Sequence, residues 1–200
     1  MRDEFAHLCS QALGGSAVGT EPLIFYGTAA CPEGAETAYG SQGASGNSRD
    51  AGNEARGDVR ARGFWKKRRD CIFDVRITDT DAKSYGNVDS KKILERFARE
   101  KKAKYKDACF ERRRDFTPLV YSVDGLPCKE AQDAERRLGA LLAKKWERSY
   151  SEMVGYVRTR MSLAVVRANT LMLRGERANT WARRGATDGT MASSVGNANN

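Results

Sequence analysis

A segment without core-forming residues divides this chain. Residues 27–57 contain seven glycines and no Val, Ile, Leu, Met, Phe or Trp. Such a segment has too few apolar side chains to offset the conformational entropy lost on folding. We therefore expect 27–57 to be a flexible Gly/Ala/Ser-rich insertion, so that a folded core must combine 1–26 with 58–175. Residues 176–200 are rich in Arg, Gly, Ala and Asn and predict a disordered tail.

The hydrophobic pattern outside the insertion changes repeatedly between helix and strand periods. Residues 1–26 predict a helix over 2–13 and a first strand over 22–26. Strands are then expected at 58–66, 70–78 and 116–123, and helices at 90–114, 128–146 and 150–173. The element order is αβββαβαα. It predicts an α/β fold in which a small mixed sheet is flanked by helices.

The expected strand 70–78 has two different faces. One face carries Cys71, Phe73, Val75 and Ile77, and the other carries Ile72, Asp74, Arg76 and Thr78. Asp58 begins the preceding strand. If the two strands form a hairpin, the carboxylates of Asp58 and Asp74 can lie on the same side of the sheet.

A lysine interrupts the apolar stripe of the helix expected at 90–114. Lys101 lies four residues from both Phe97 and Tyr105, which belong to that stripe. An ammonium group in such a place needs a carboxylate or phosphate partner. Alternatively, the lysine extends past its apolar neighbours to water.

Two carboxylates beside a cation suit metal-assisted hydrolysis of a phosphodiester. Mg²⁺ held by carboxylates can activate water, and a nearby basic residue can stabilise the charge of the transition state. The net charge of +9 suits an acidic partner, and nucleic acid is the commonest one. A basic run could follow a DNA backbone: Lys66, Lys67, Arg68 and Arg69.

An ordered series of short segments covers about 1–26 and 55–175: 1–5 (MRDEF), 20–22 (TEP), 57–59 (GDV), 73–85 (FDVRITDTDAKSY), 101–105 (KKAKY), 116–120 (FTPLV) and 156–164 (YVRTRMSLA). The series resembles the PD-(D/E)xK restriction-like nuclease superfamily. More closely, it resembles the restriction-like endonuclease domain found C-terminal to the reverse transcriptase in some non-LTR retroelements. This resemblance implies a restriction-endonuclease-like core.

The resemblance also implies roles for single residues. Asp58 and Asp74 match the family's metal ligands, and Glu21 matches a further acidic position ahead of the first strand. Lys101, Lys104 and Tyr105 match the helix motif, and Lys101 would orient the water or stabilise the transition state. The implied cofactor is Mg²⁺ or Mn²⁺. Further phosphate contacts would come from Lys104, from Arg76 and from the basic run Lys66, Lys67, Arg68 and Arg69.

The implied function is that of a metal-dependent DNA endonuclease domain that nicks target DNA. Its partner would be DNA, and it would normally belong to a larger polymerase-containing polypeptide that is intracellular and nuclear. The longest apolar runs are four residues, which excludes a membrane span. The five cysteines are odd in number and widely separated, which favours reduced thiols inside a cell.

Three departures from the family pattern keep alternatives open. Gly57 stands where a proline is usual, Arg76 stands where a strand lysine is usual, and the expected upstream Cys/His zinc knuckle is absent. One alternative is a catalytically inactive nucleic-acid-binding remnant of the same fold. In a simpler interpretation, Asp74 only pairs with Arg76 or Arg60. A third alternative is a helical interaction module built on 128–173.

Overall fold

The computed structural model describes residues 1–25 and 55–185. Its elements are α1 (Arg2–Leu13), η1 (Gly15–Ala17), β1 (Val18–Thr20), β2 (Leu23–Phe25), β3 (Ala55–Arg56), β4 (Val59–Arg62), β5 (Asp70–Thr78), η2 (Lys83–Tyr85), α2 (Ser90–Glu111), β6 (Asp115–Ser122), α3 (Lys129–Trp146) and α4 (Tyr150–Gly185). None of the described helices combines the length and apolarity that crossing a membrane requires.

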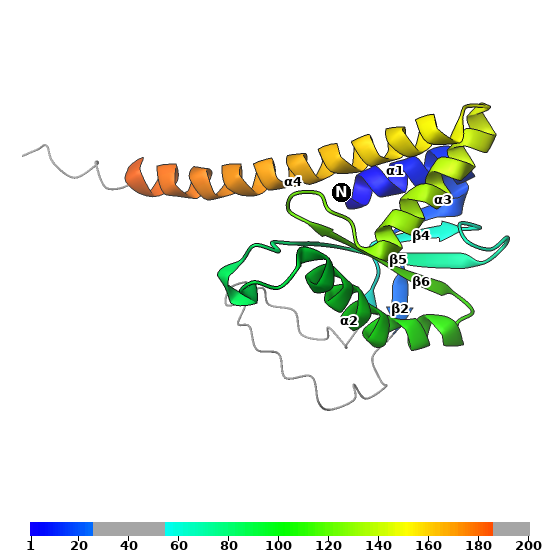
Figure 1. Ribbon diagram of the computed structural model, residues 1–200, viewed down its shortest axis with the longest axis horizontal. Coiled ribbons are helices and arrows are strands. Elements are labelled where there is room, and N and C mark those ends of the chain that lie inside the picture. Colours follow the sequence, from blue (N-terminus) through cyan, green and yellow to red (C-terminus); the bar gives the residue numbers. More distant parts are fainter. Residues whose placement is uncertain (26–54, 186–200) are drawn as a thin grey trace, which may run out of the picture.

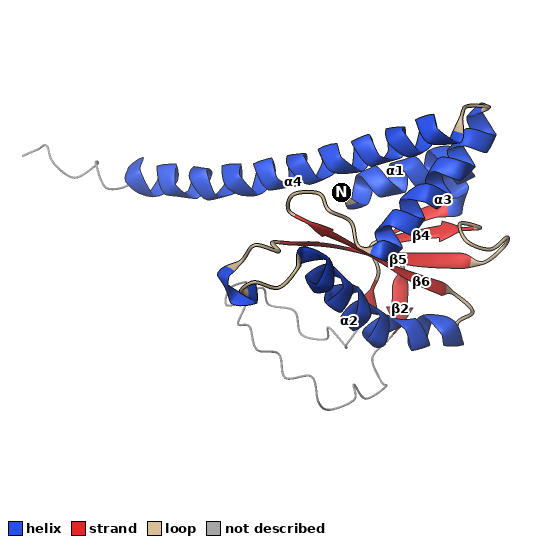
Figure 2. Ribbon diagram, viewed as in Figure 1, coloured by secondary structure: helices blue, strands red, loops and turns tan. Residues whose placement is uncertain are grey.

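The predicted α/β class with a mixed sheet flanked by helices is confirmed. A four-stranded sheet has the order β1-β4-β5-β6, in which β5 and β6 are parallel and the other neighbours antiparallel. A separate two-stranded sheet joins β2 to β3. Helix α2 connects β5 to β6 on one face, α1 and α3 cover the other, and α4 packs on α3 and α1 (Figures 1 and 2).

The two faces of β5 pack as its alternation predicts. On the α2 face, Ile72 forms a small cluster with Ile24, Tyr105 and Cys109. On the opposite face, the ring of Phe73 lies 4.8 Å from that of Phe5. Because the two faces contact different layers, the register of β5 decides which of its side chains face α2. Asp74 shares the α2 face with Ile72.

The predicted end of the insertion at residue 57 and the predicted end of the following strand at residue 66 are both wrong. Residues 55–57 are ordered: β3 pairs with β2, and the Gly57 amide donates to the Pro22 carbonyl at 2.9 Å. Composition missed this because a pairing made by backbone groups needs few apolar side chains. Strand β4 also ends at Arg62, where Gly63 begins a turn with φ of +83°. The rest of the predicted insertion lies outside the described residues.

Helix α4 continues past its predicted end near residue 173 to Gly185. The prediction ended the helix near 173 and began the tail at 176, after Gly175, but a single glycine inside a helix costs only about 1 kcal/mol relative to alanine. Residues 176–185 are therefore helical, although they were assigned to a disordered tail; 186–200 lie outside the described residues. Figure 1 shows the end of α4 projecting well past the sheet.

Candidate functional site

Asp58 lies at an irregularity between β3 and β4. Its amide donates to the Phe73 carbonyl at 2.9 Å, although Val59 is the residue paired with Phe73. Two residues therefore oppose one, which is the arrangement of a β-bulge. Asp58 Oδ2 accepts a hydrogen bond from the Val75 amide at 2.6 Å. This bond fixes the half-buried carboxylate against β5 beside Asp74.

Asp74 is a buried carboxylate that meets the ammonium group of Lys101. The Asp74 residue is 7% exposed, and Lys101 Nζ lies 2.7 Å from its Oδ2. The two atoms are close, but their angle falls outside hydrogen-bond geometry, so the buried Oδ2 has an ion-pair partner without an aligned hydrogen bond. Lys101 therefore meets a carboxylate, as expected of an ammonium group within an apolar stripe. The expected hairpin is also present, since β4 and β5 are antiparallel.

The charges around Asp74 act on one another. Burial raises the pKa of Asp74, and the ammonium group of Lys101, 2.7 Å away, lowers it. The negative charge of Asp58 raises the pKa and Lys104 lowers it; the raised pKa is the net result. Ionised Asp74 is therefore destabilising in the fold, and Lys101 offsets only part of that cost. Of the predicted site, the structure brings Asp58, Asp74, Lys101 and Lys104 together.

Tyr105 is a packing residue beneath the two lysines. Its ring lies 5.7 Å from Lys101 Nζ and 5.1 Å from Lys104 Nζ, and 5.5 Å from the ring of Phe116. The residue is 8% exposed. Tyr105 therefore presents an aromatic surface to both ammonium groups.

Arg76 contacts groups other than Asp74. Its guanidinium carbon lies 3.6 Å from the centroid of the Phe97 ring, and its Nη1 lies 3.9 Å from Glu100 Oε2. Its Nε donates to Thr78 Oγ1 at 3.2 Å. Asp74 pairs with Lys101 instead, so the simpler interpretation in which it pairs with Arg76 or Arg60 is wrong.

The carboxylate of Glu21 is directed to another partner. The Glu21 amide donates to the Asp58 carbonyl at 3.0 Å, which places its backbone next to the site. Its side chain is 61% exposed, however, and accepts from Arg2 Nη1 at 2.7 Å. Over 1–25 and 55–185, no group of three or more His, Cys, Asp or Glu side chains is arranged to hold a metal. Glu21 thus does not complete a three-carboxylate site.

The predicted basic run forms the turn between β4 and β5. Lys66, Lys67 and Arg68 are exposed, and Arg69 Nε lies 3.1 Å from Asp115 Oδ1. Asp74 is separated from the start of β5 by about 13 Å of extended chain. The turn is therefore a basic end of the hairpin that lies away from the two carboxylates.

Gly57 is required by close packing next to Asp58. A Cβ atom at this position would lie 2.4 Å from Ile72 Cγ2, and the Gly57 amide is used in a hydrogen bond that proline cannot make. We expect Gly57→Ala to lower the free energy of unfolding by about 1–3 kcal/mol, measured by urea denaturation. Gly155→Ala is the control, because open space surrounds that helical glycine. Equal stability of the Gly57→Ala and wild-type proteins would contradict this packing argument.

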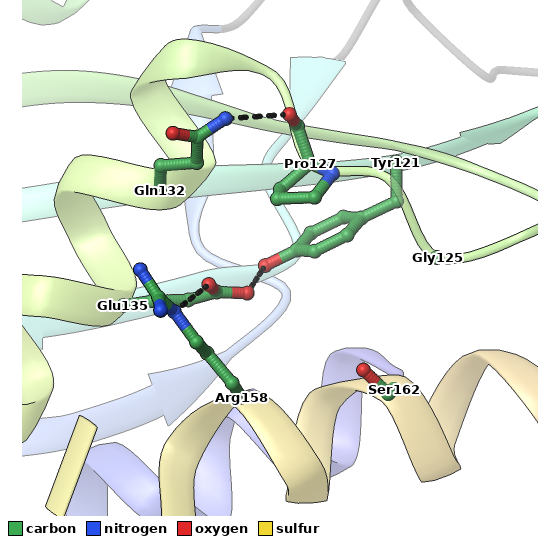
Figure 3. A pocket seen from close by; sticks show the side chains of 7 residues that line it. All are labelled: Tyr121, Gly125, Pro127, Gln132, Glu135, Arg158 and Ser162. Carbon is green, nitrogen blue, oxygen red and sulfur yellow. Dashed lines mark hydrogen bonds and ion pairs between the residues drawn. The ribbon is translucent and has the colours of Figure 1, made fainter. Parts of the chain in front are cut away.

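A second polar cluster lies on the opposite face of the sheet (Figure 3). The Tyr121 hydroxyl donates to Glu135 Oε1 at 2.9 Å, and Arg158 Nε lies 3.9 Å from Glu135 Oε2. Together they line part of a cavity of about 280 Å³ between β6, α3 and α4. Burial raises the pKa of Glu135, and the Tyr121 hydrogen bond lowers it in part. Sequence reasoning missed this cluster; its signal is an acidic residue within the apolar stripe of α3.

The candidate site therefore consists of Asp58, Asp74 and Lys101, with Lys104 at its edge and Tyr105 beneath. It lies on the α2 face, and neither Glu21 nor the basic turn contributes a side chain to it. No family model, curated protein or solved structure matches this chain.

Proposed function

We propose that this chain is a metal-dependent DNA endonuclease domain of a retroelement protein, which hydrolyses a phosphodiester to nick target DNA. The observation that carries the proposal is the buried Asp74 carboxylate, held 2.7 Å from Lys101 Nζ and beside the fixed carboxylate of Asp58. Ionisable groups whose pKa is shifted by burial and by specific charges are concentrated at functional sites. Such an arrangement is unfavourable for folding alone and suits a site that handles charge.

The two carboxylates fit a divalent cation. The buried Asp74 Oδ2 lacks an aligned hydrogen bond, and the charge of Asp58 raises the pKa of Asp74, so a cation between them would favour both ionised forms. Asp58 and Asp74 would hold Mg²⁺ or Mn²⁺, because Mg²⁺ commonly takes one or two carboxylates plus water and phosphate oxygens. When bound, the ion would supply activated water and charge neutralisation.

Lys101 has two roles in this proposal. Its ammonium group lowers the pKa of Asp74 and so favours the ionised ligand. The same positive charge, next to a bound phosphodiester, would stabilise the extra negative charge of the transition state. Lys104 adds a second positive charge at the edge of the site.

The architecture supports the proposal at a coarser level. An antiparallel β4–β5 pair followed by a helical crossover to a parallel β6 agrees with the restriction-endonuclease-like core that the sequence series suggests. The net charge of +9 and the exposed basic turn favour DNA as the substrate. The polymerase-containing parent polypeptide and a nuclear location belong to the same proposal.

Plasmid nicking tests the proposed activity. We expect the wild-type protein to convert supercoiled plasmid to nicked circles with Mg²⁺ or Mn²⁺ and to leave it supercoiled in EDTA. Agarose gel electrophoresis separates the two forms. DNA binding without nicking in any divalent metal would refute the nuclease.

One observation favours the alternative of a catalytically inactive nucleic-acid-binding remnant. Lys101 already forms an ion pair with Asp74, while the Glu21 carboxylate is paired with Arg2. The remnant would bind DNA through its basic surface without hydrolysing it. The nicking assay separates the two functions, since both predict binding and one predicts a metal-dependent product.

The basic turn is expected to contribute to DNA affinity under either function. Replacing Lys66 and Lys67 by alanine should lower the slope of log affinity against log salt by about two, because each phosphate contact contributes about 0.9. Fluorescence anisotropy of a labelled duplex at several salt concentrations measures this slope. The matched control replaces Lys129 and Lys144, which are exposed on α3. An unchanged slope for the turn variant would remove the turn from the DNA-binding surface.

A further inference from the structure

Beside the candidate site, two arginines make cation–π contacts with two aromatic rings. The guanidinium carbon of Arg76 lies 3.6 Å from the Phe97 centroid, and that of Arg96 lies 5.1 Å from the same centroid. Arg96 also lies 5.4 Å from the Tyr85 ring, whose centroid is 6.2 Å from that of Phe97. Tyr85, Arg96, Phe97 and Arg76 thus form one arginine–aromatic cluster between η2, α2 and β5.

Close contact with the Phe97 ring prepares Arg76 to bind an anion. A guanidinium stacked on a ring uses its planar face, while its N–H groups lie along the edge of the plane. The packed ring of Phe97 restricts the orientation of Arg76, so less side-chain entropy remains to be lost on binding. Guanidinium groups bind phosphate through paired N–H donors, and oriented guanidiniums suit that geometry.

A single carboxylate partly neutralises both arginines. Glu100 Oε2 lies 3.9 Å from Arg76 Nη1, and Glu100 Oε1 lies 3.8 Å from Arg96 Nε. Both distances exceed those of a hydrogen bond, and the Glu100 side chain is 53% exposed. These are weak pairs, so a phosphate that approaches the arginines competes with a loosely held carboxylate.

The cluster is aligned with the candidate site along α2. Arg96, Glu100 and Lys104 follow at intervals of four residues, and the interval from Arg96 to Lys104 spans about 12 Å of helix. Lys101, with its partner Asp74, lies within that interval. Each strand of B-DNA carries one charge per about 3.4 Å of axis, so this length is enough to contact more than one phosphate of a strand.

We propose that the arginine–aromatic cluster docks the DNA strand next to the scissile phosphate and that Glu100 weakens this docking by competing for Arg76 and Arg96. The inference rests on the proposed function and specifies where the substrate strand lies. One strand would run along α2, with the reacting phosphodiester at Asp74 and Lys101 and a neighbouring phosphate at the two arginines. Lys104 would contact the strand on the other side.

Two variants with opposite expected effects test this docking site. Arg96→Ala should weaken binding of a labelled duplex about threefold or more and lower the salt slope by about one. Glu100→Gln should strengthen binding by about twofold or more, because it removes the competing charge. Fluorescence anisotropy in EDTA measures affinity without cleavage. The matched controls are Arg99→Ala and Glu95→Gln, which alter exposed residues turned about 60° from Arg96 and about 140° from Glu100 around α2.

The outcomes separate the docking site from the proposed function. Weaker binding by Arg96→Ala together with tighter binding by Glu100→Gln supports the docking site, since a folding defect cannot increase affinity. If both variants bind like their controls, or if Glu100→Gln binds more weakly than wild type, the docking site is wrong and the nuclease proposal is unaffected. If the wild-type protein binds no DNA at low salt, the docking site and the proposed function both fail.

Discussion

Asp74→Asn is expected to lose nicking while keeping or increasing stability. The amide cannot act as an anionic metal ligand, so the nicking rate should fall by about 10²–10³-fold or more. Burial raises the pKa of Asp74, which means that the ionised carboxylate destabilises the fold at neutral pH. A neutral side chain of the same shape removes that cost, and Lys101 is exposed enough to turn its ammonium group to water. The free energy of unfolding should therefore rise by about 1 kcal/mol or less at pH 7.

Plasmid nicking and urea denaturation of the same preparation check both halves of this expectation. Asp124→Asn is the control, because it makes the same chemical change at an exposed turn between β6 and α3. It should nick like wild type. If Asp74 served only to hold α2 to the sheet, Asp74→Asn would instead lose stability. Wild-type nicking by Asp74→Asn would exclude this carboxylate from the chemistry.

Lys101→Met is expected to lower both activity and stability, in contrast to Asp74→Asn. Removal of the ammonium group takes away the positive charge that would stabilise the transition state. Nicking should therefore slow by about 10²-fold. It also leaves a buried carboxylate without its counter-ion, which should lower the free energy of unfolding by about 1–3 kcal/mol at pH 7. Methionine retains most of the apolar stem, so the loss reports chiefly on charge.

The stability loss of Lys101→Met should depend on pH. The folded-state pKa of Asp74 lies above its unfolded value, and removing Lys101 raises it further. The stability that such a group contributes is present below its unfolded pKa and is lost as pH rises through its folded pKa. The variant should therefore be close to wild type near pH 3.5 and show its full loss at pH 7. Urea denaturation at both values measures the difference.

Lys104→Met provides the matched control for that series. Lys104 is exposed and acts on Asp74 only through its charge, so its replacement should change stability much less at either pH. A loss for Lys101→Met that is equal at pH 3.5 and pH 7 would show that the lysine contributes packing rather than charge. In that case the Asp74–Lys101 contact would not be the electrostatic centre of the site.

The parts of the site that the sequence predicted are those fixed by local periodicity. Alternation along 70–78 assigned Asp74 to the face of Ile72, and the helical stripe of α2 directed Lys101 inward. A half-buried ammonium group facing a buried carboxylate then follows from the cost of leaving either unpaired. The helix crossover between β5 and β6 brings the two together.

The features that the sequence did not predict depend on contacts between distant segments. Glu21 lies beside Asp58 through backbone pairing, but whether its carboxylate meets Arg2 or the site depends on where α1 packs. The partner of Glu135 is a tyrosine on β6, and no spacing within α3 specifies it. Residues 55–57 are ordered because of backbone hydrogen bonds and the fit of Gly57 against Ile72. Hydropathy describes neither of these.

We propose that Asp58, Asp74 and Lys101 form a hydrolytic site for DNA. Its most direct test compares the nicking of supercoiled plasmid by the wild-type protein and by Asp74→Asn, in Mg²⁺ and in EDTA, after circular dichroism has shown that both are folded. We expect nicked circles from the wild-type protein in Mg²⁺ alone and none from Asp74→Asn in either condition. Equal nicking by the two proteins, or none by the wild-type protein in any divalent metal, would contradict it.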